Sequence, residues 1–79
     1  MPSPEQHIEW AQENQRAYAE AVEEYNRTRD PIYLADAMRN AYGELLNWMD
    51  ADQRQLAGDA KERHDECRAA LEAELRGGR

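Results

Sequence analysis

Residues 31–49 read PIYLADAMRNAYGELLNWM, and this stretch decides the fold of the 79-residue chain. Pro31 suits the first position of a helix, where its missing N–H has no partner to lose, and Asp30 before it is a favourable N-cap. At 100° per residue the apolar side chains fall on one half of this helix: Leu34, Ala35, Ala37, Met38, Ala41, Tyr42, Leu45, Leu46, Trp48 and Met49. The other half holds mainly Asp36, Arg39, Asn40, Gly43, Glu44 and Asn47. Because so wide an apolar face can contact two neighbours, we predict that residues 31–49 form the central helix of a bundle.

The preceding segment predicts a first helix over residues 4–27. Ser3 supplies an N-cap, Pro4 occupies the first helical position, and Gln6 stands where it can close a capping box. Apolar and aromatic residues gather on one side of this helix and glutamates on the other. We therefore expect an amphipathic helix with a strongly acidic outer face.

The following segment predicts a third helix over residues 51–76. Asp50 is the expected N-cap, with Gln53 three residues later, and no glycine pair interrupts the pattern before residue 77. The apolar stripe of this helix is narrow and consists of Leu56, Ala60, Cys67, Leu71 and Leu75. We expect residues 1–79 to form a single domain, an all-α antiparallel three-helix bundle with a flexible tail at 77–79.

The core of this bundle is expected to be thin. Leu, Ile and Val together number nine, Phe is absent, and thirteen residues are alanine. For a chain of this size the free energy gained from apolar burial only about balances the loss of conformational entropy. We therefore expect a homodimer to complete the core, with the interface nearest the ends of the first and third helices, which overhang the shorter second helix.

Charge and composition narrow the partners. Seventeen acidic against ten basic residues give a net charge of −7, which disfavours direct nucleic-acid binding and favours protein partners with basic or apolar surfaces. No stretch has the length and apolarity of a membrane span or secretory leader, so we expect a cytoplasmic protein that does not bind membranes. Nine Arg against one Lys is typical of a GC-rich bacterial or phage genome.

Residues for catalysis or metal binding are scarce. The one serine and the one threonine, Ser3 and Thr28, fit caps and turns. His64 and Cys67 lie on consecutive turns of the third helix, but a zinc site needs further ligands, and both fall on the apolar stripe. We therefore expect no catalytic centre, no metal and no cofactor.

Six residues are candidates for binding a protein partner. Glu9, Glu13 and Glu20 lie on the acidic face, which is either a solvated surface or a footprint for a basic partner. Trp10 at the edge of its apolar arc and Tyr33 on the polar side of its helix are expected to be exposed anchors. Trp48 is the third aromatic candidate, although its position on the apolar arc favours packing in the core.

These features favour a small acidic regulatory or accessory protein that binds a protein partner through apolar surface on the first and second helices, without catalysis and with self-association. The alternative is an acidic inhibitor, of the kind that phages encode, whose glutamate face occupies a basic or nucleic-acid-binding surface of a target protein.

Overall fold

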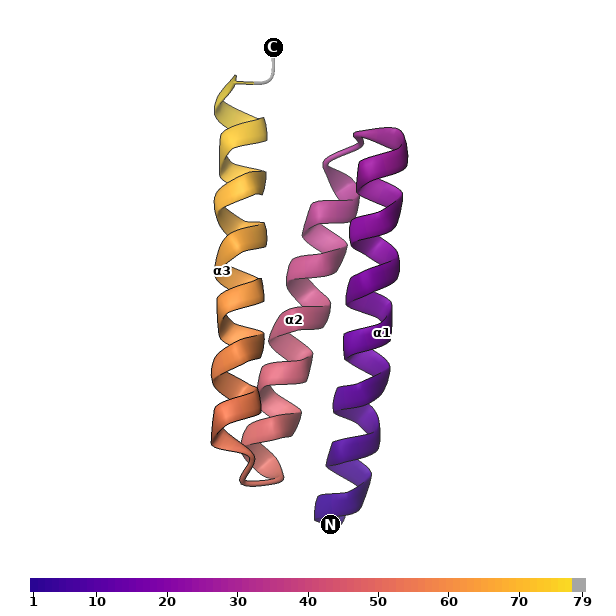
Figure 1. Cartoon of the computed structure of the whole chain (residues 1–79), viewed down its shortest axis with the longest axis vertical. Helices are drawn as coiled ribbons and strands as arrows, with labels where there is room; N and C mark the ends of the chain where they lie inside the picture. Colours follow the sequence, from indigo (N-terminus) through magenta and orange to yellow (C-terminus); the bar gives the residue numbers. More distant parts are fainter. Residues whose placement is uncertain (78–79) are drawn as a thin grey trace.

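The computed structural model describes residues 1–77, which form three helices (Figure 1). Helix α1 spans Pro4–Thr28, α2 spans Ile32–Asp50 and α3 spans Arg54–Gly77. α2 packs against both neighbours and runs antiparallel to them in an elongated body of 45 × 18 × 18 Å. The prediction of an all-α antiparallel three-helix bundle with a central second helix is confirmed.

The start of α1 follows the sequence closely. The hydroxyl of Ser3 accepts a hydrogen bond from the backbone N–H of Gln6 at 3.2 Å, so Ser3 is the N-cap. The Gln6 side chain donates forward to Glu9 at 3.4 Å instead of back to the cap. The capping-box prediction is therefore correct for the serine and wrong for the glutamine.

The α1–α2 connection is short and capped at both ends. Arg29 takes the left-handed conformation at φ 61°, and its N–H donates to the carbonyl of Tyr25 at 2.6 Å, which ends α1. The Asp30 carboxylate accepts from the N–H of Ile32 at 3.1 Å. α2 begins at Ile32, one residue after the predicted start, and Pro31 rather than the predicted Asp30 occupies its N-cap position.

The α2–α3 connection differs from the prediction. Asp50, the predicted N-cap, lies in the last turn of α2, and α3 begins at Arg54 instead of residue 51. The N–H groups of Asp52 and Gln53 donate to α2 carbonyls at 3.0 and 2.8 Å, with Asp52 at φ 58°, the arrangement of a Schellman motif. The sequence hides this turn because an aspartate, which tolerates the left-handed region, replaces the usual glycine.

The end of α3 also differs from the prediction by one residue. Gly77, expected to begin a flexible tail, is the last residue of α3. The rest of the predicted tail, residues 78–79, lies outside the described residues.

The core is built largely from alanine. Two clusters of buried residues follow the bundle axis: Ala11, Trp48, Ala57 and Ala60 form one, and Ala21, Ala37 and Cys67 form the other. Two leucines predicted for the buried stripe of the third helix are exposed, Leu56 by 39 % and Leu75 by 72 %, because small residues on the adjoining turns make the helix contact instead. Among residues 1–77 no helix is long and apolar enough to cross a membrane.

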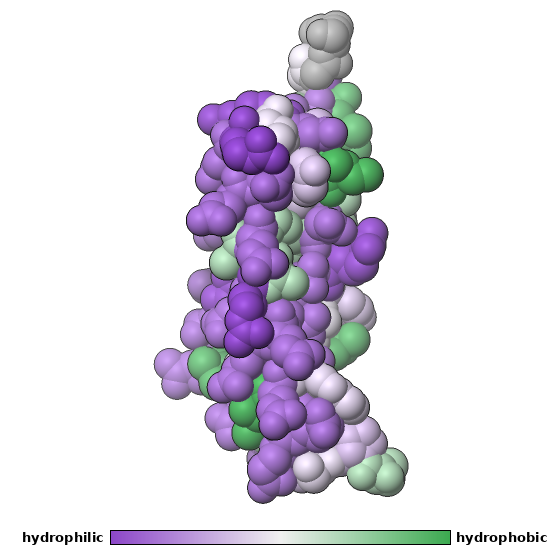
Figure 2. Space-filling model, turned by 90° about the vertical axis from the view of Figure 1, so that its right-hand side faces the viewer, coloured by the Kyte–Doolittle hydropathy of each residue, from purple (hydrophilic) through white to green (hydrophobic). Residues whose placement is uncertain are grey.

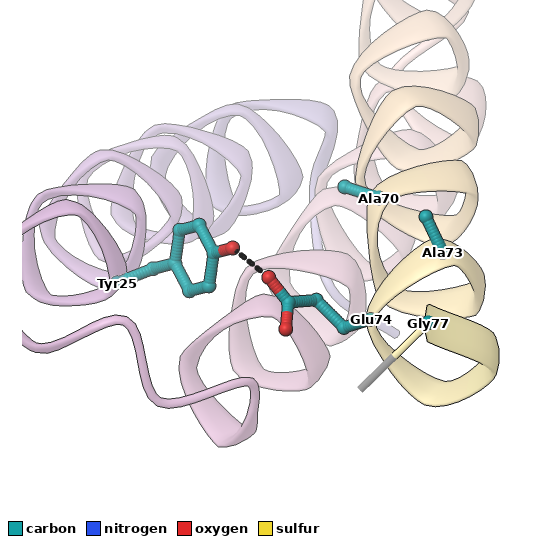
Figure 3. Close-up of a pocket in the computed structure, with 5 residues that line it drawn as sticks. All are labelled: Tyr25, Ala70, Ala73, Glu74 and Gly77. Atoms are coloured by element: carbon teal, nitrogen blue, oxygen red, sulfur yellow. Dashed lines mark hydrogen bonds between the residues drawn. The ribbon is translucent and has the colours of Figure 1, made fainter. Parts of the chain in front are cut away.

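α1 and α3 meet through long side chains rather than through close backbone packing. The guanidinium of Arg63 lies 5.8 Å from the ring centre of Tyr18, and the hydroxyl of Tyr25 donates a hydrogen bond to the carboxylate of Glu74. Figure 3 shows this second contact bridging the two helices beside a pocket whose α3 wall consists of Ala70, Ala73, Glu74 and Gly77. α2 therefore supplies most of the contacts that hold the bundle together.

Candidate functional site

Part of the face of α2 that contacts α1 is polar. Asn47 donates through Nδ2 to Oδ1 of Asn14 at 3.1 Å, and Asn14 in turn donates to Oδ1 of Asn40 at 3.3 Å. His7 Nδ1 lies 2.9 Å from Oδ1 of Asn47. Asn14 also packs over Gly43, where an added Cβ would lie 3.1 Å from its side chain. These residues form an amide ladder, a chain of side-chain hydrogen bonds that fastens α1 to α2.

One acidic residue of α2 is fully buried. Oε2 of Glu44 accepts hydrogen bonds from Nε1 of Trp48 at 2.8 Å and from the Arg63 guanidinium of α3 at 2.6 Å. Within residues 1–77, Glu44 Oε1 and Arg63 Nε have no hydrogen-bond partner. Sequence analysis assigned Glu44 to the polar outer half of its helix, and this assignment is wrong because α3 offers a matching positive charge.

The face of α2 that points away from α1 carries a row of apolar side chains in contact with solvent. Ile32 is 63 %, Tyr42 51 %, Leu46 44 % and Met49 58 % exposed. Together with Ala35 and Arg39 they make up the α2 stripe: Ile32, Ala35, Arg39, Tyr42, Leu46 and Met49. Successive members are separated by three and four residues in alternation, the spacing of a helix-packing seam.

The α2 stripe continues into a groove beside α3. One end of the groove is lined by Ala35, Met38, Arg39, Tyr42 and His64, and the other by Met38, His64, Arg68, Leu71, Glu72 and Leu75. Tyr42 and His64 stand with ring centres 5.9 Å apart at the join. An apolar helix face with an adjoining groove can accept another helix, which is the chemistry of protein–protein recognition.

The predicted acidic residues lie on a different side of the molecule. Glu9, Glu13 and Glu20 are all exposed on α1, and the α1 side of the molecule is mainly hydrophilic in Figure 2. Within residues 1–77 no ion pair involves any of these three side chains. They therefore form a free acidic face, separate from the α2 stripe.

The three aromatic candidates have different environments. Trp10 is 38 % exposed and stands edge-on to the ring of His7 at 5.4 Å, whereas Tyr33 is half-buried. Trp48 is only 5 % exposed and holds Glu44, so it belongs to the core and is not part of the accessible surface. The structure does not bring these three residues together into one site.

His64 and Cys67 do not form a paired site. His64 faces the groove beside Tyr42, whereas the Cys67 thiol is buried and donates to the hydroxyl of Tyr18 at 3.7 Å. Burial raises the pKa of the Cys67 thiol, and burial together with the thiol contact raises the pKa of Tyr18 to about 12. Among the described residues, no group of three or more metal-ligating side chains comes together.

The sequence predicts a partner on apolar surface of the first and second helices, but it does not single out the residues of the stripe, because most of the apolar arc of the central helix is expected to be core. The signal was present, since the stripe repeats the alternating three- and four-residue spacing on its own. Comparison with protein-family models, with curated proteins and with solved structures found no match.

Proposed function

We propose that this protein is a small, non-enzymatic accessory or regulatory protein that acts by binding a protein partner through the α2 stripe. The observation that carries the proposal is the exposure of Ile32, Tyr42, Leu46 and Met49 along one helix that is otherwise the centre of the fold. Contiguous exposed apolar surface on a small protein is typical of an interaction site.

The placement of polar residues strengthens this proposal. α2 contacts α1 partly through Asn40, Gly43 and Asn47. Its Tyr42, Leu46 and Met49 remain exposed to solvent. Burying the stripe would contribute roughly 25 cal/mol for each Å² of apolar surface removed from water. A partner helix thus has more to gain from this face than from any charged face of the bundle.

The acidic face supports the alternative proposal, an inhibitor of a basic surface. Glu9, Glu13 and Glu20 are exposed and spaced along α1, and they are free to pair with arginines or lysines of a target. Exposed glutamates are also what keeps a small protein soluble, so this face requires less explanation than the apolar stripe.

Site-specific photo-crosslinking separates the two proposals. A benzoylphenylalanine replaces either Leu46 on the stripe or Glu13 on the acidic face, and the cells of origin are irradiated. We expect adducts from position 46 and none from position 13, and a variant with Gln at 9, 13 and 20 should retain the adduct at 46. Adducts from position 13 that this triple variant abolishes would replace the stripe proposal by the inhibitor.

A further inference from the structure

We infer that a second copy of this chain covers the α2 stripe, with the two α2 helices packed antiparallel about a two-fold axis. The inference rests on the proposed function, since it names the partner for the same surface. It is carried by the order of residues along the stripe, the position of its single charge and the charges at its two ends.

When two copies of the stripe pack antiparallel, the residues that face each other across the two-fold axis are complementary in size. With the axis between residues 40 and 41, Ile32 faces Met49 of the second copy and Ala35 faces Leu46. Each small or branched side chain thereby meets a longer one, as interdigitation at a helix seam requires. Every contact occurs twice, as expected of a two-fold interface.

The one charged residue of the stripe also finds a partner in this arrangement. Arg39 faces Tyr42 of the second copy, and a guanidinium over a phenol ring is a favourable cation–π pair. Among residues 1–77 the ion-pair partner of Arg39 is Asp36, 3.6 Å away on the exposed surface. A parallel pair of helices would instead place the two Arg39 side chains side by side, where like charges repel.

The two ends of the stripe carry opposite charges at equal separations in sequence from the axis, and Asp52 at one end also pairs with Arg54 of its own chain at 3.4 Å. Arg29 precedes Ile32 by three residues and Asp52 follows Met49 by three, and both are exposed. The antiparallel arrangement therefore brings Arg29 of each copy toward Asp52 of the other. A parallel arrangement would bring like ends together.

The acidic face does not oppose this association at short range. Glu9, Glu13 and Glu20 lie on α1, which packs on the side of α2 that carries the amide ladder. The net charge of −7 on each copy still gives a long-range repulsion, which salt screens. Self-association should therefore strengthen as salt rises, whereas binding to a basic partner should weaken.

Sedimentation equilibrium of the purified full chain tests the inference. We expect a species of twice the chain mass of 9.2 kDa for the wild type, and a shift toward the single mass for Leu46→Glu. The matched control is Ala19→Glu, which adds the same charge at an exposed position of α1 and should remain dimeric. Circular dichroism melts establish that both variants keep the helical fold.

Disulfide trapping tests the antiparallel orientation in a Cys67→Ala background. Chains with Cys at 35 and chains with Cys at 46 should crosslink when mixed and oxidised. Each variant alone should not, because residues eleven apart along a helix are about 16 Å apart and a disulfide spans at most about 7 Å between Cα atoms. Crosslinking of either variant alone would overturn the antiparallel arrangement.

A wild type that stays monomeric to about 1 mM would overturn the inference, because even a dissociation constant of about 1 mM leaves half of the chains paired there. A dimer that Leu46→Glu does not weaken would also overturn it. In either case, adducts between position 46 and another protein would keep the proposed function while removing the second copy as the partner. Absence of any adduct from position 46 would remove the proposed function itself.

Discussion

Two faces of α2 on either side of its buried core residues differ in polarity. Against α1 the helix presents Asn40, Gly43 and Asn47, joined to α1 through hydrogen bonds and close packing. Toward solvent it presents Tyr42 and Leu46. In addition to the apolar residues that it buries in the core, α2 thus places half-buried amides against α1 and leaves a tyrosine and a leucine in contact with solvent.

The polar contacts of α2, unlike its alanine contacts, specify one alignment of the three helices. An alanine core gives little directional information, since alanines fit many helix alignments, whereas an amide ladder forms only when the donors and acceptors are in register. The ladder and the buried Glu44–Arg63 pair therefore fix how the three helices align. The α2 stripe takes no part in fixing this alignment, so it is available to the proposed partner.

The largest effect is expected at the buried ion pair. Arg63→Ala removes the cation that faces the fully buried Glu44 carboxylate, and breaking such a pair costs about 3–5 kcal/mol. We expect a lowered free energy of unfolding of this size in urea titration followed by circular dichroism.

The double variant Arg63→Ala with Glu44→Gln is the control for this loss. A neutral amide can keep the hydrogen bond from Trp48 without a buried charge, so the double variant should be more stable than Arg63→Ala alone. Equal stability of the two variants would show that Glu44 contributes packing and not charge to the inner face.

The sequence predicts the helices and their order better than it predicts which side chains of each helix are buried. The Ser3 cap and the order of the helices follow from local chemistry, which acts within one turn. The burial of Glu44 depends on Arg63, nineteen residues away on another helix. No helical phase calculation contains that information, because it treats each helix without its neighbours.

The amide ladder is expected to give the second largest effect. Asn47→Ala removes one donor to Asn14 and the acceptor beside His7, so half-buried polar groups lose partners at a cost of about 1–3 kcal/mol. Asn26→Ala at an exposed position of α1 is the control and should change stability by less than about 0.5 kcal/mol. Similar urea midpoints for the two variants would mean that the ladder contributes nothing to stability.

A smaller effect on stability is expected from replacing either of two helical glycines, Gly58 or Gly43, by alanine. Gly58 on α3 has no heavy atom within 4 Å of an added Cβ, so Gly58→Ala should stabilise the protein by about 1 kcal/mol through helix propensity. At Gly43 the new Cβ would lie 3.1 Å from Asn14, so Gly43→Ala should gain measurably less, because the ladder must shift. Equal thermal stabilisation by both substitutions would show that the α1–α2 contact tolerates a wider spacing.

The smallest effect is expected at Leu46 on the outer face, with its neighbour Leu45 as the matched core position. Leu45 packs against the core, and Leu45→Gln should destabilise the monomer by about 2 kcal/mol, whereas the exposed Leu46→Gln should change it by less than about 0.5 kcal/mol. Both are measured below about 1 μM, where a weak dimer dissociates. Raising the protein concentration should then stabilise the wild type and not Leu46→Gln, because a second copy binds only the folded chain. A wild-type melting temperature that is independent of concentration would leave the stripe without a homotypic role.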